Sequence, residues 1–242
     1  MCYQKVIYGM PYEFHGFEGV EAYLFRGGTE IKTLGNPALD SWFGYLQAAA
    51  VKKEVRTVIV ANPYVEEGRA AVAARNDSNE TAMLYAMTAK RDRSPILGQQ
   101  ANQLILLDYD LIKEKTAAQG SEVFMAVLLH ESTHLLEQYL TNDLGIYNGL
   151  SPENRAGYHE NVLLPMLEDP AFMYLRESAE YQKNYMGEEA LTCLVEVLTF
   201  LHLKALADQS CAACFQNVIA SLGNKLSAAV EIAHRDRYLT NI

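Results

Sequence analysis

One apolar helix that carries two histidines constrains this chain more than any other feature. Residues 121–141, SEVFMAVLLHESTHLLEQYLT, contain the pentapeptide HESTH at 130–134 and neither glycine nor proline. Ser121 is a suitable N-cap for a helix that begins there. Residues four apart in a helix lie one turn above each other, so His130 and His134 can direct both imidazoles at one point. The stretch therefore predicts a continuous helix with a pair of metal ligands.

The apolar residues of this helix indicate which of its sides is buried. At ~100° per residue, the side away from the histidines carries Phe124, Met125, Leu128, Leu129, Leu135, Leu136, Tyr139 and Leu140. On the histidine side, Val123, Ala126 and Val127 lie upstream, whereas Glu137, Gln138 and Thr141 lie downstream. We therefore expect the two imidazoles at the border between an apolar helix and a polar cleft.

The H-E-x-x-H pattern combines the residue types that a hydrolytic zinc site needs. Zinc accepts nitrogen ligands from histidine and keeps one position open for water when the site is catalytic. The ion lowers the pKa of that water and polarises a carbonyl group. Glu131, beside His130, would take the proton of the water and pass it to the leaving amine. We expect a Zn²⁺ cofactor held by His130 and His134, Glu131 as the catalytic base, and a peptide or protein substrate.

A third protein ligand is needed, and a carboxylate from a later helix is the usual one. The H-x-x-G-x-x-H continuation is absent, because Glu137 and Leu140 stand where its glycine and third histidine would be. Six residues are candidates: Glu153, His159, Glu160, Glu188, Glu189 and Glu196. Glu189, Cys193 and Glu196 share one helix face. Glu196 lies among leucines and valines, where a carboxylate needs a cation, a donor or a proton.

Two segments resemble known metallopeptidases. The pentapeptide at 130–134 resembles that of the zincins, and the missing third histidine is similar to the gluzincin branch, whose third ligand is glutamate. Residues 188–192, EEALT, resemble the E-E-x-x-T stretch of clostridial neurotoxin light chains, in which the second glutamate binds zinc. The helix that follows is similar to the glutamate helix of anthrax lethal factor. This resemblance implies Glu189 as the third zinc ligand, Tyr185 as a catalytic residue that stabilises the oxyanion, and a bacterial effector or toxin-like endopeptidase.

One rival ligand follows from another resemblance. Glu153 follows His134 at the interval typical of thermolysin-like aminopeptidases, although SPENR at 151–155 lacks the N-E motif of those enzymes. Glu189, Glu196 and Glu153 therefore all remain candidates for the third position.

The predicted fold class is α+β and zincin-like, in a single catalytic domain over 1–242. Residues 1–141 are expected to form an upper lobe with a small mixed sheet and the central metal-binding helix, and 142–242 a helical lower lobe. The expected strands are 5–10, a hairpin of 20–26 and 30–34, 55–61 and 103–110. The expected helices are 38–53, 67–75, 121–141, 151–166, 170–184, 187–207 and 216–237. Because strand 103–110 precedes the metal helix, we hypothesise that a substrate peptide pairs with its edge.

Composition limits the classes of binding partner and the cellular compartments that we expect for this chain. Half of the 242 residues are hydrophobic and the net charge is −10, which argues against a nucleic-acid partner. No apolar run is expected to span a bilayer, and the N-terminus lacks the form of a signal peptide. The cytoplasm is the default location, and export by a signal-less route would leave the same sequence. Cys211 and Cys214 form a single C-x-x-C, which we interpret as two small buried residues.

Two other functions use the same residues. A zinc protein without turnover would have a closed site of four protein ligands, including His159 or Cys193. A zinc hydrolase that acts on a non-peptide amide would need the same ion and the same glutamate.

Overall fold

The computed structural model describes ten stretches of the chain. These are residues 2–7, 10–15, 30–31, 33–52, 57–61, 86–90, 103–107, 122–140, 150–168 and 186–235. The chain divides into two compact units, one of residues 1–32 and 54–132 and the other of residues 33–53 and 133–242. The boundary at 132/133 falls inside α5 (Glu122–Leu140), a continuous helix. The predicted helix at 121–141 is thus confirmed to within one residue at each end.

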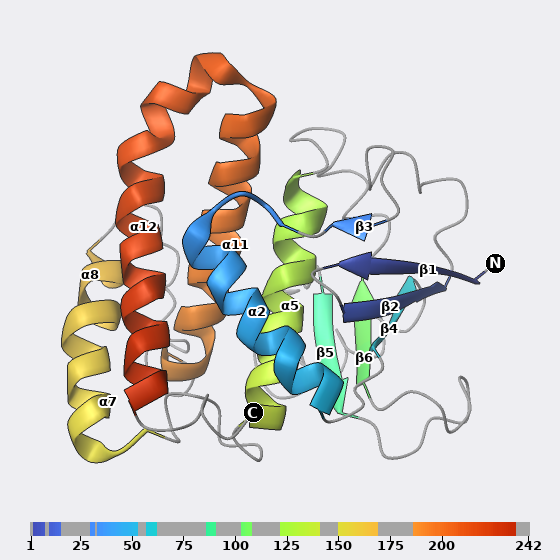
Figure 1. Ribbon diagram of the computed structural model, residues 1–242, viewed down its shortest axis with the longest axis horizontal. Coiled ribbons are helices and arrows are strands. Elements are labelled where there is room, and N and C mark those ends of the chain that lie inside the picture. Colours follow the sequence, from blue (N-terminus) through green and yellow to red (C-terminus); the bar gives the residue numbers. More distant parts are fainter. Residues whose placement is uncertain are drawn as a thin grey trace, which may run out of the picture. The chain divides into compact units, whose positions relative to one another are not determined.

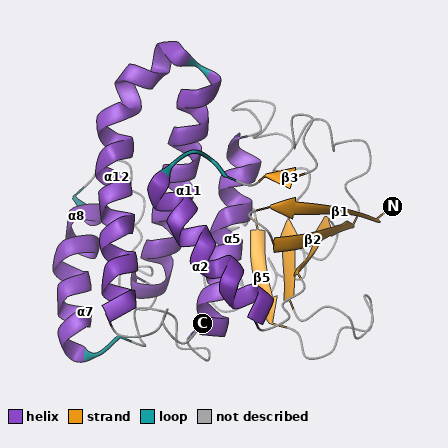
Figure 2. Ribbon diagram, viewed as in Figure 1, coloured by secondary structure: helices purple, strands orange, loops and turns teal. Residues whose placement is uncertain are grey.

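The first unit contains a six-stranded mixed sheet. Its strands, in the spatial order β3-β1-β2-β4-β6-β5 (Figures 1 and 2), are β3 (Glu30–Ile31), β1 (Cys2–Ile7), β2 (Met10–His15), β4 (Thr57–Ala61), β6 (Gln103–Leu107) and β5 (Ala86–Lys90). The β1–β2 and β5–β6 pairs are antiparallel, and the other three pairs are parallel. β3 pairs with β1 in parallel, and residues 20–26 lie outside the described residues, so the predicted hairpin of 20–26 and 30–34 remains a prediction.

The strand that precedes the metal helix is not an edge. β6 pairs with β4 on one side and with β5 on the other, so that Ile105 faces both Ile59 and Thr88. The hypothesis that a substrate peptide adds to this strand is therefore wrong, because both rows of its backbone hydrogen-bonding groups are already paired. β5, for which no strand was predicted, occupies the end of the strand order instead.

The second unit is helical. Besides the last turns of α5 it contains α2 (Pro37–Lys52), α7 (Pro152–Tyr158), the π-helical segment η1 (His159–Leu163), α8 (Leu164–Leu167), α11 (Met186–Ala207) and α12 (Gln209–Arg235). α11 and α12 lie side by side and are joined by Asp208 (Figure 1). The Asp208 carboxylate accepts bonds from the Ser210 N–H at 2.9 Å and the Ser210 hydroxyl at 2.6 Å, which caps α12.

α12 is the helix against which the others are packed. It contacts α2, α7, η1 and α11. Its apolar side contributes Leu222, Leu226, Ala229, Ile232 and Ala233 to the core. This burial follows from an apolar stripe at helical spacing.

Helices account for 90% of the residues whose side-chain surroundings the structure describes. The predicted fold class, α+β and zincin-like with a small N-terminal mixed sheet, is therefore wrong for these residues. The physical reason is that the buried side chains of α2, α5, α11 and α12 make up most of the core among them. The sheet of the first unit is described by the backbone pairing of its strands. The prediction of one domain with lobes of 1–141 and 142–242 remains a prediction.

Residues 151–168 form one helical stretch with a wider turn in its middle. Ser151 caps it by accepting a bond from the Asn154 N–H at 3.3 Å. Pro165 has no N–H to donate to the carbonyl four residues earlier, and the Leu164 N–H reaches back to the His159 carbonyl instead. This five-residue step is the π-helical segment η1. The predicted helix of 151–166 is confirmed, whereas that of 170–184 falls outside the described residues.

Asn36 fixes the start of α2 and offers a direct test of the local structure. Its buried side-chain oxygen accepts bonds from the Ala38 N–H at 3.1 Å and the Leu39 N–H at 3.2 Å. We expect Asn36→Ala to lower the free energy of unfolding by ~1 kcal/mol, because two N–H groups of the first turn lose their acceptor. Urea unfolding followed by far-ultraviolet circular dichroism measures the change. Asn36→Asp, which keeps the acceptor, should lose much less, and equal losses would contradict this account.

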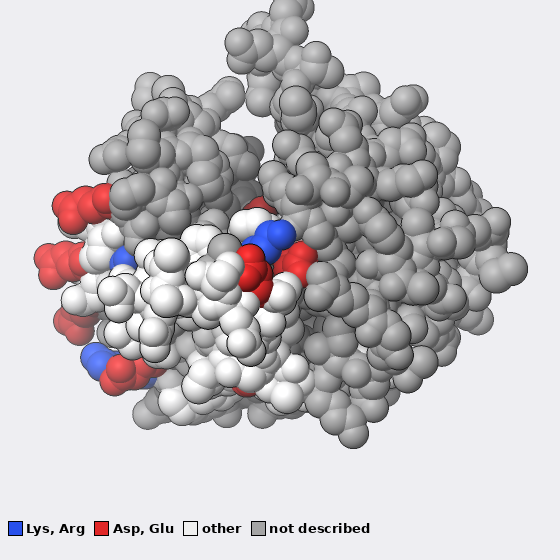
Figure 3. All heavy atoms as spheres, turned by 90° about the horizontal axis from the view of Figure 1, so that it is seen from above, with Lys and Arg blue, Asp and Glu red and all other residues white. Residues whose placement is uncertain are grey.

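One described helix is long and apolar enough to cross a membrane, in contrast to the expectation from the sequence. It is the segment Ala190–Ala207 of α11, which is 44% buried. Its buried residues pack against α12 and η1, as those of a core helix do. The described surface in Figure 3 is mostly uncharged, with its acidic side chains in small groups.

Candidate metal centre

α5 is buried more completely than the sequence indicated. Phe124, Leu128 and Leu129 are fully buried, as expected for the side away from the histidines. Ala126 and Val127 are buried as well, although they were assigned to the histidine side. The part of α5 that precedes the motif is therefore buried on nearly all sides. The polar side chains of the motif consequently follow an apolar, buried segment.

The residues between the two histidines hold the motif in place. The Ser132 hydroxyl donates to the Leu128 carbonyl at 2.7 Å, one turn back along the helix. The Thr133 hydroxyl, fully buried, accepts a long bond of 3.5 Å from the Trp42 indole N–H of α2. Glu131 is only 7% exposed. The central positions of HESTH thus have internal packing roles, and Glu131 is shielded from bulk water.

Two potential metal ligands share one face of α11. Cys193 and Glu196 are three residues apart on this helix, Cys193 buried and Glu196 half-buried. His130 of α5 is half-buried.

The other sequence candidates lie on α5, α7, η1 and α11 or outside the described residues. Glu153 and Glu160 are exposed, and His159 is half-buried in η1. For His134, Glu188 and Glu189 the helical backbone is described but the side chains lie outside the description, as does all of Tyr185. His134 lies one turn after His130 on α5. Glu189 lies seven residues before Glu196 on α11, which is ~10.5 Å along the helix axis.

The cysteine pair at 211 and 214 does not match its interpretation as two buried residues. Both positions lie in α12, which begins at Gln209 and not near 216, and Cys214 is exposed. The side chain of Cys211 lies outside the description. Cys193 is the buried cysteine among the described ones, and its signal in the sequence was the helix face that it shares with two glutamates.

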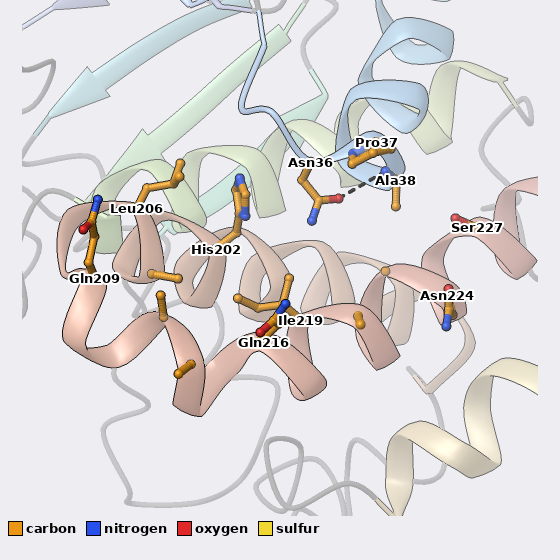
Figure 4. Close-up of a pocket in the computed structure, with 15 residues that line it drawn as sticks. Asn36, Pro37, Ala38, His202, Leu206, Gln209, Gln216, Ile219, Asn224 and Ser227 are labelled. Carbon is orange, nitrogen blue, oxygen red and sulfur yellow. Dashed lines mark hydrogen bonds between the residues drawn. The ribbon is translucent and has the colours of Figure 1, made fainter.

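A separate groove in the helical unit has a volume of about 750 Å³. Its walls are the start of α2, the second half of α11 and the first half of α12 (Figure 4). The His202 Nε2 atom lies 2.8 Å from the Leu34 carbonyl oxygen, and no Asp, Glu, Lys or Arg side chain lines the groove. Neither Cys193 nor Glu196 lines it, so this groove is not the candidate metal centre.

No family model, no curated protein and no solved structure matches this chain. The resemblance to zincins consequently rests on residues 130–134 and 188–192 alone.

Proposed function

We propose that this protein is a zinc-dependent metallopeptidase that cleaves within a peptide or protein substrate. The observation that carries the proposal is that the H-E-x-x-H motif lies on the continuous helix α5, on which His130 and His134 are one turn apart. The motif supplies two imidazoles and a base, and Glu196 supplies the carboxylate that the motif lacks. A hydrolytic zinc site needs no other ligand than these and water.

The ligands in this proposal are His130, His134 and Glu196. Glu196 is favoured over Glu189 because it follows the fully buried Leu194 and Val195 on α11, where a carboxylate needs a cation or a hydrogen-bond donor. Glu189 instead is a residue in the first turn of α11, where a negative charge offsets the helix dipole.

Glu131 carries the proton transfer. A zinc ion at this site supplies a bound water of lowered pKa and a Lewis acid for the scissile carbonyl. Glu131 follows His130 directly, and its low exposure keeps competing water from its carboxylate. In this surrounding the carboxylate accepts the proton of the attacking water and later donates it to the leaving amine.

Two of the glutamates of α11, Glu189 and Glu196, provide matched variants for the ligand assignment. We expect Glu196→Gln to weaken zinc binding by more than the ~10–100-fold that loss of an outer partner costs, because a direct ligand is removed. Glu189→Gln, the same chemical change on the same helix, should leave affinity within a few-fold of the native value. Competition with a chromophoric chelator measures both. The reverse order of affinities would assign Glu189, and equal retention would return Glu153 to consideration.

Cys193, which is buried one turn before Glu196 on α11, favours a second candidate function. With His130, His134 and Glu196 it would make four protein ligands, the number found in structural zinc sites. In that case the protein is stabilised by zinc and catalyses nothing, so that chelation lowers the unfolding temperature while a peptide library stays uncut in every variant. The same library, extended with non-peptide amides, separates a peptidase from an amidase.

A further inference from the structure

The groove of the helical unit has the size and the lining of a ligand site, and the proposed hydrolysis does not use it. All of its lining residues belong to the second unit, and its volume of about 750 Å³ is within the ~300–1,000 Å³ usual for small-molecule sites. Small residues recur along its α12 wall, among them Ala213, Ala220 and Gly223. At the end where α11 and α12 meet, the groove is lined by Leu206, which is 61% exposed.

The Asn36 amide presents to this groove a hydrogen-bond donor that no described group uses. The residue is 7% exposed, and its side-chain oxygen accepts the N–H groups of Ala38 and Leu39. These two donors fix which end of the amide is the oxygen, so the nitrogen points away from the helix start and toward α12 (Figure 4). A largely buried donor without an acceptor is unfavourable, and a ligand that brings an acceptor removes that cost.

His202 adds an acceptor on the same wall. The Leu34 carbonyl can only accept, so the His202 Nε2 atom, 2.8 Å away, carries the hydrogen of this bond. In the neutral ring the Nδ1 atom is then an acceptor. Leu34 lies two residues before Asn36, and Figure 4 shows His202 and Asn36 next to each other, across from Gln216 and Ile219 of α12. The wall thus offers a donor and an acceptor close together.

We infer that this groove binds an uncharged, elongated molecule with an apolar chain and a terminal amide. The amide oxygen accepts from the Asn36 Nδ2 atom, and the amide N–H donates to the His202 Nδ1 atom. The chain lies along the small residues of α12 and covers Leu206. Ions are disfavoured, because no Asp, Glu, Lys or Arg side chain lines the groove to compensate a charge that loses its water. This site is separate from the proposed metal centre and does not depend on it.

Calorimetric titration of the native chain with hexanamide, octanamide and decanamide tests the inference. We expect the affinity to rise about fourfold with each additional CH₂ group that is buried. Octanamide should bind about tenfold tighter than octanoate or octylammonium, which have similar chains and charged head groups. The absence of binding by all three amides up to their solubility limits would overturn the inference, and so would tighter binding of either ion.

Two variants and one matched control locate the ligand. Ala220→Leu fills the groove from an exposed position of α12 and should weaken octanamide binding about tenfold or more, whereas Ala207→Leu, at an exposed alanine outside the lining, should leave it unchanged. Asn36→Asp keeps the oxygen that caps α2 and replaces the donor by a second oxygen. It should weaken octanamide binding about tenfold and make octylammonium the preferred ligand. Unchanged octanamide binding in both Ala220→Leu and Asn36→Asp would overturn the inference.

A measurement on the native chain covers the case in which a variant does not fold. In nitrogen NMR of the isotope-labelled protein, octanamide should shift the side-chain amide signals of Asn36 and the Nδ1 signal of His202. The side-chain signals of Asn217, which is exposed outside the groove, should stay in place. Octanamide that binds without shifting the Asn36 and His202 signals occupies another site and contradicts the assignment. A second copy of the chain is the rival occupant, and a dimer in sedimentation velocity that Ala220→Leu dissociates would replace the small molecule by that copy.

Discussion

Glu131→Gln is expected to reduce peptide cleavage by about 10²–10⁴-fold, the range that general base catalysis contributes, and to leave zinc content unchanged. Glutamine has nearly the shape of glutamate but cannot accept the proton of the attacking water. It also stays compatible with the buried position, since Glu131 is 7% exposed and an amide there carries no charge to desolvate. The measured quantity is the rate of cleavage of a peptide library per mole of bound zinc. If the native chain is slow, this rate is measured in the Cys193→Ser background.

Glu137→Gln, the same change six residues further along α5, is the matched control and should keep the native rate. Retained zinc with lost cleavage supports the assignment of the base. Cleavage that persists in Glu131→Gln at the native rate would refute the proposed mechanism, whatever the ligands of the ion. If zinc is lost together with activity, the glutamate has a role in holding the site, and the base must be sought elsewhere.

The long helices were predictable because their signal is local. α5 and α11 end within one residue of the predicted bounds, since each is an apolar segment without proline in its interior. The order of strands was not predictable, because the pairing of β5 with β6 joins segments whose separation in sequence gives no register. For the same reason the sequence did not show that β5, and not β6, forms the edge.

The sequence predicted which face of α11 carries the candidate ligands, but not which turn of that helix takes part in the site. The sequence placed Glu189, Cys193 and Glu196 on a common face of α11, and periodicity alone treats two residues seven apart as equivalent. Which turn of α11 supplies a ligand depends on tertiary packing, which periodicity does not report. The burial of Ala126 and Val127 was missed for a related reason, because a helix enclosed on all sides has no amphipathic pattern to read.

Trp42→Ala is expected to have the largest effect on stability, a loss of ~3–5 kcal/mol in the free energy of unfolding. Trp42 is the sole tryptophan of the chain and is fully buried in α2. Its removal leaves a large cavity beside Leu39 and Phe43, and it also leaves the Thr133 hydroxyl without the indole donor. Urea unfolding followed by far-ultraviolet circular dichroism measures the loss. Against a usual stability of ~5–15 kcal/mol, this variant is close to the limit of folding.

Two milder variants separate the cavity from the hydrogen bond. Trp42→Phe retains most of the apolar volume and removes the donor, and Thr133→Val removes the acceptor. The bond is long at 3.5 Å, so a double-mutant cycle of the two should give a coupling near the lower end of ~0.5–1.5 kcal/mol. Because Thr133 directly precedes His134, the same variants should weaken zinc binding if α2 holds the motif in position. A loss of stability without any change in zinc affinity would assign Trp42 to packing only, and the geometry of the two histidines would then be set by α5 itself.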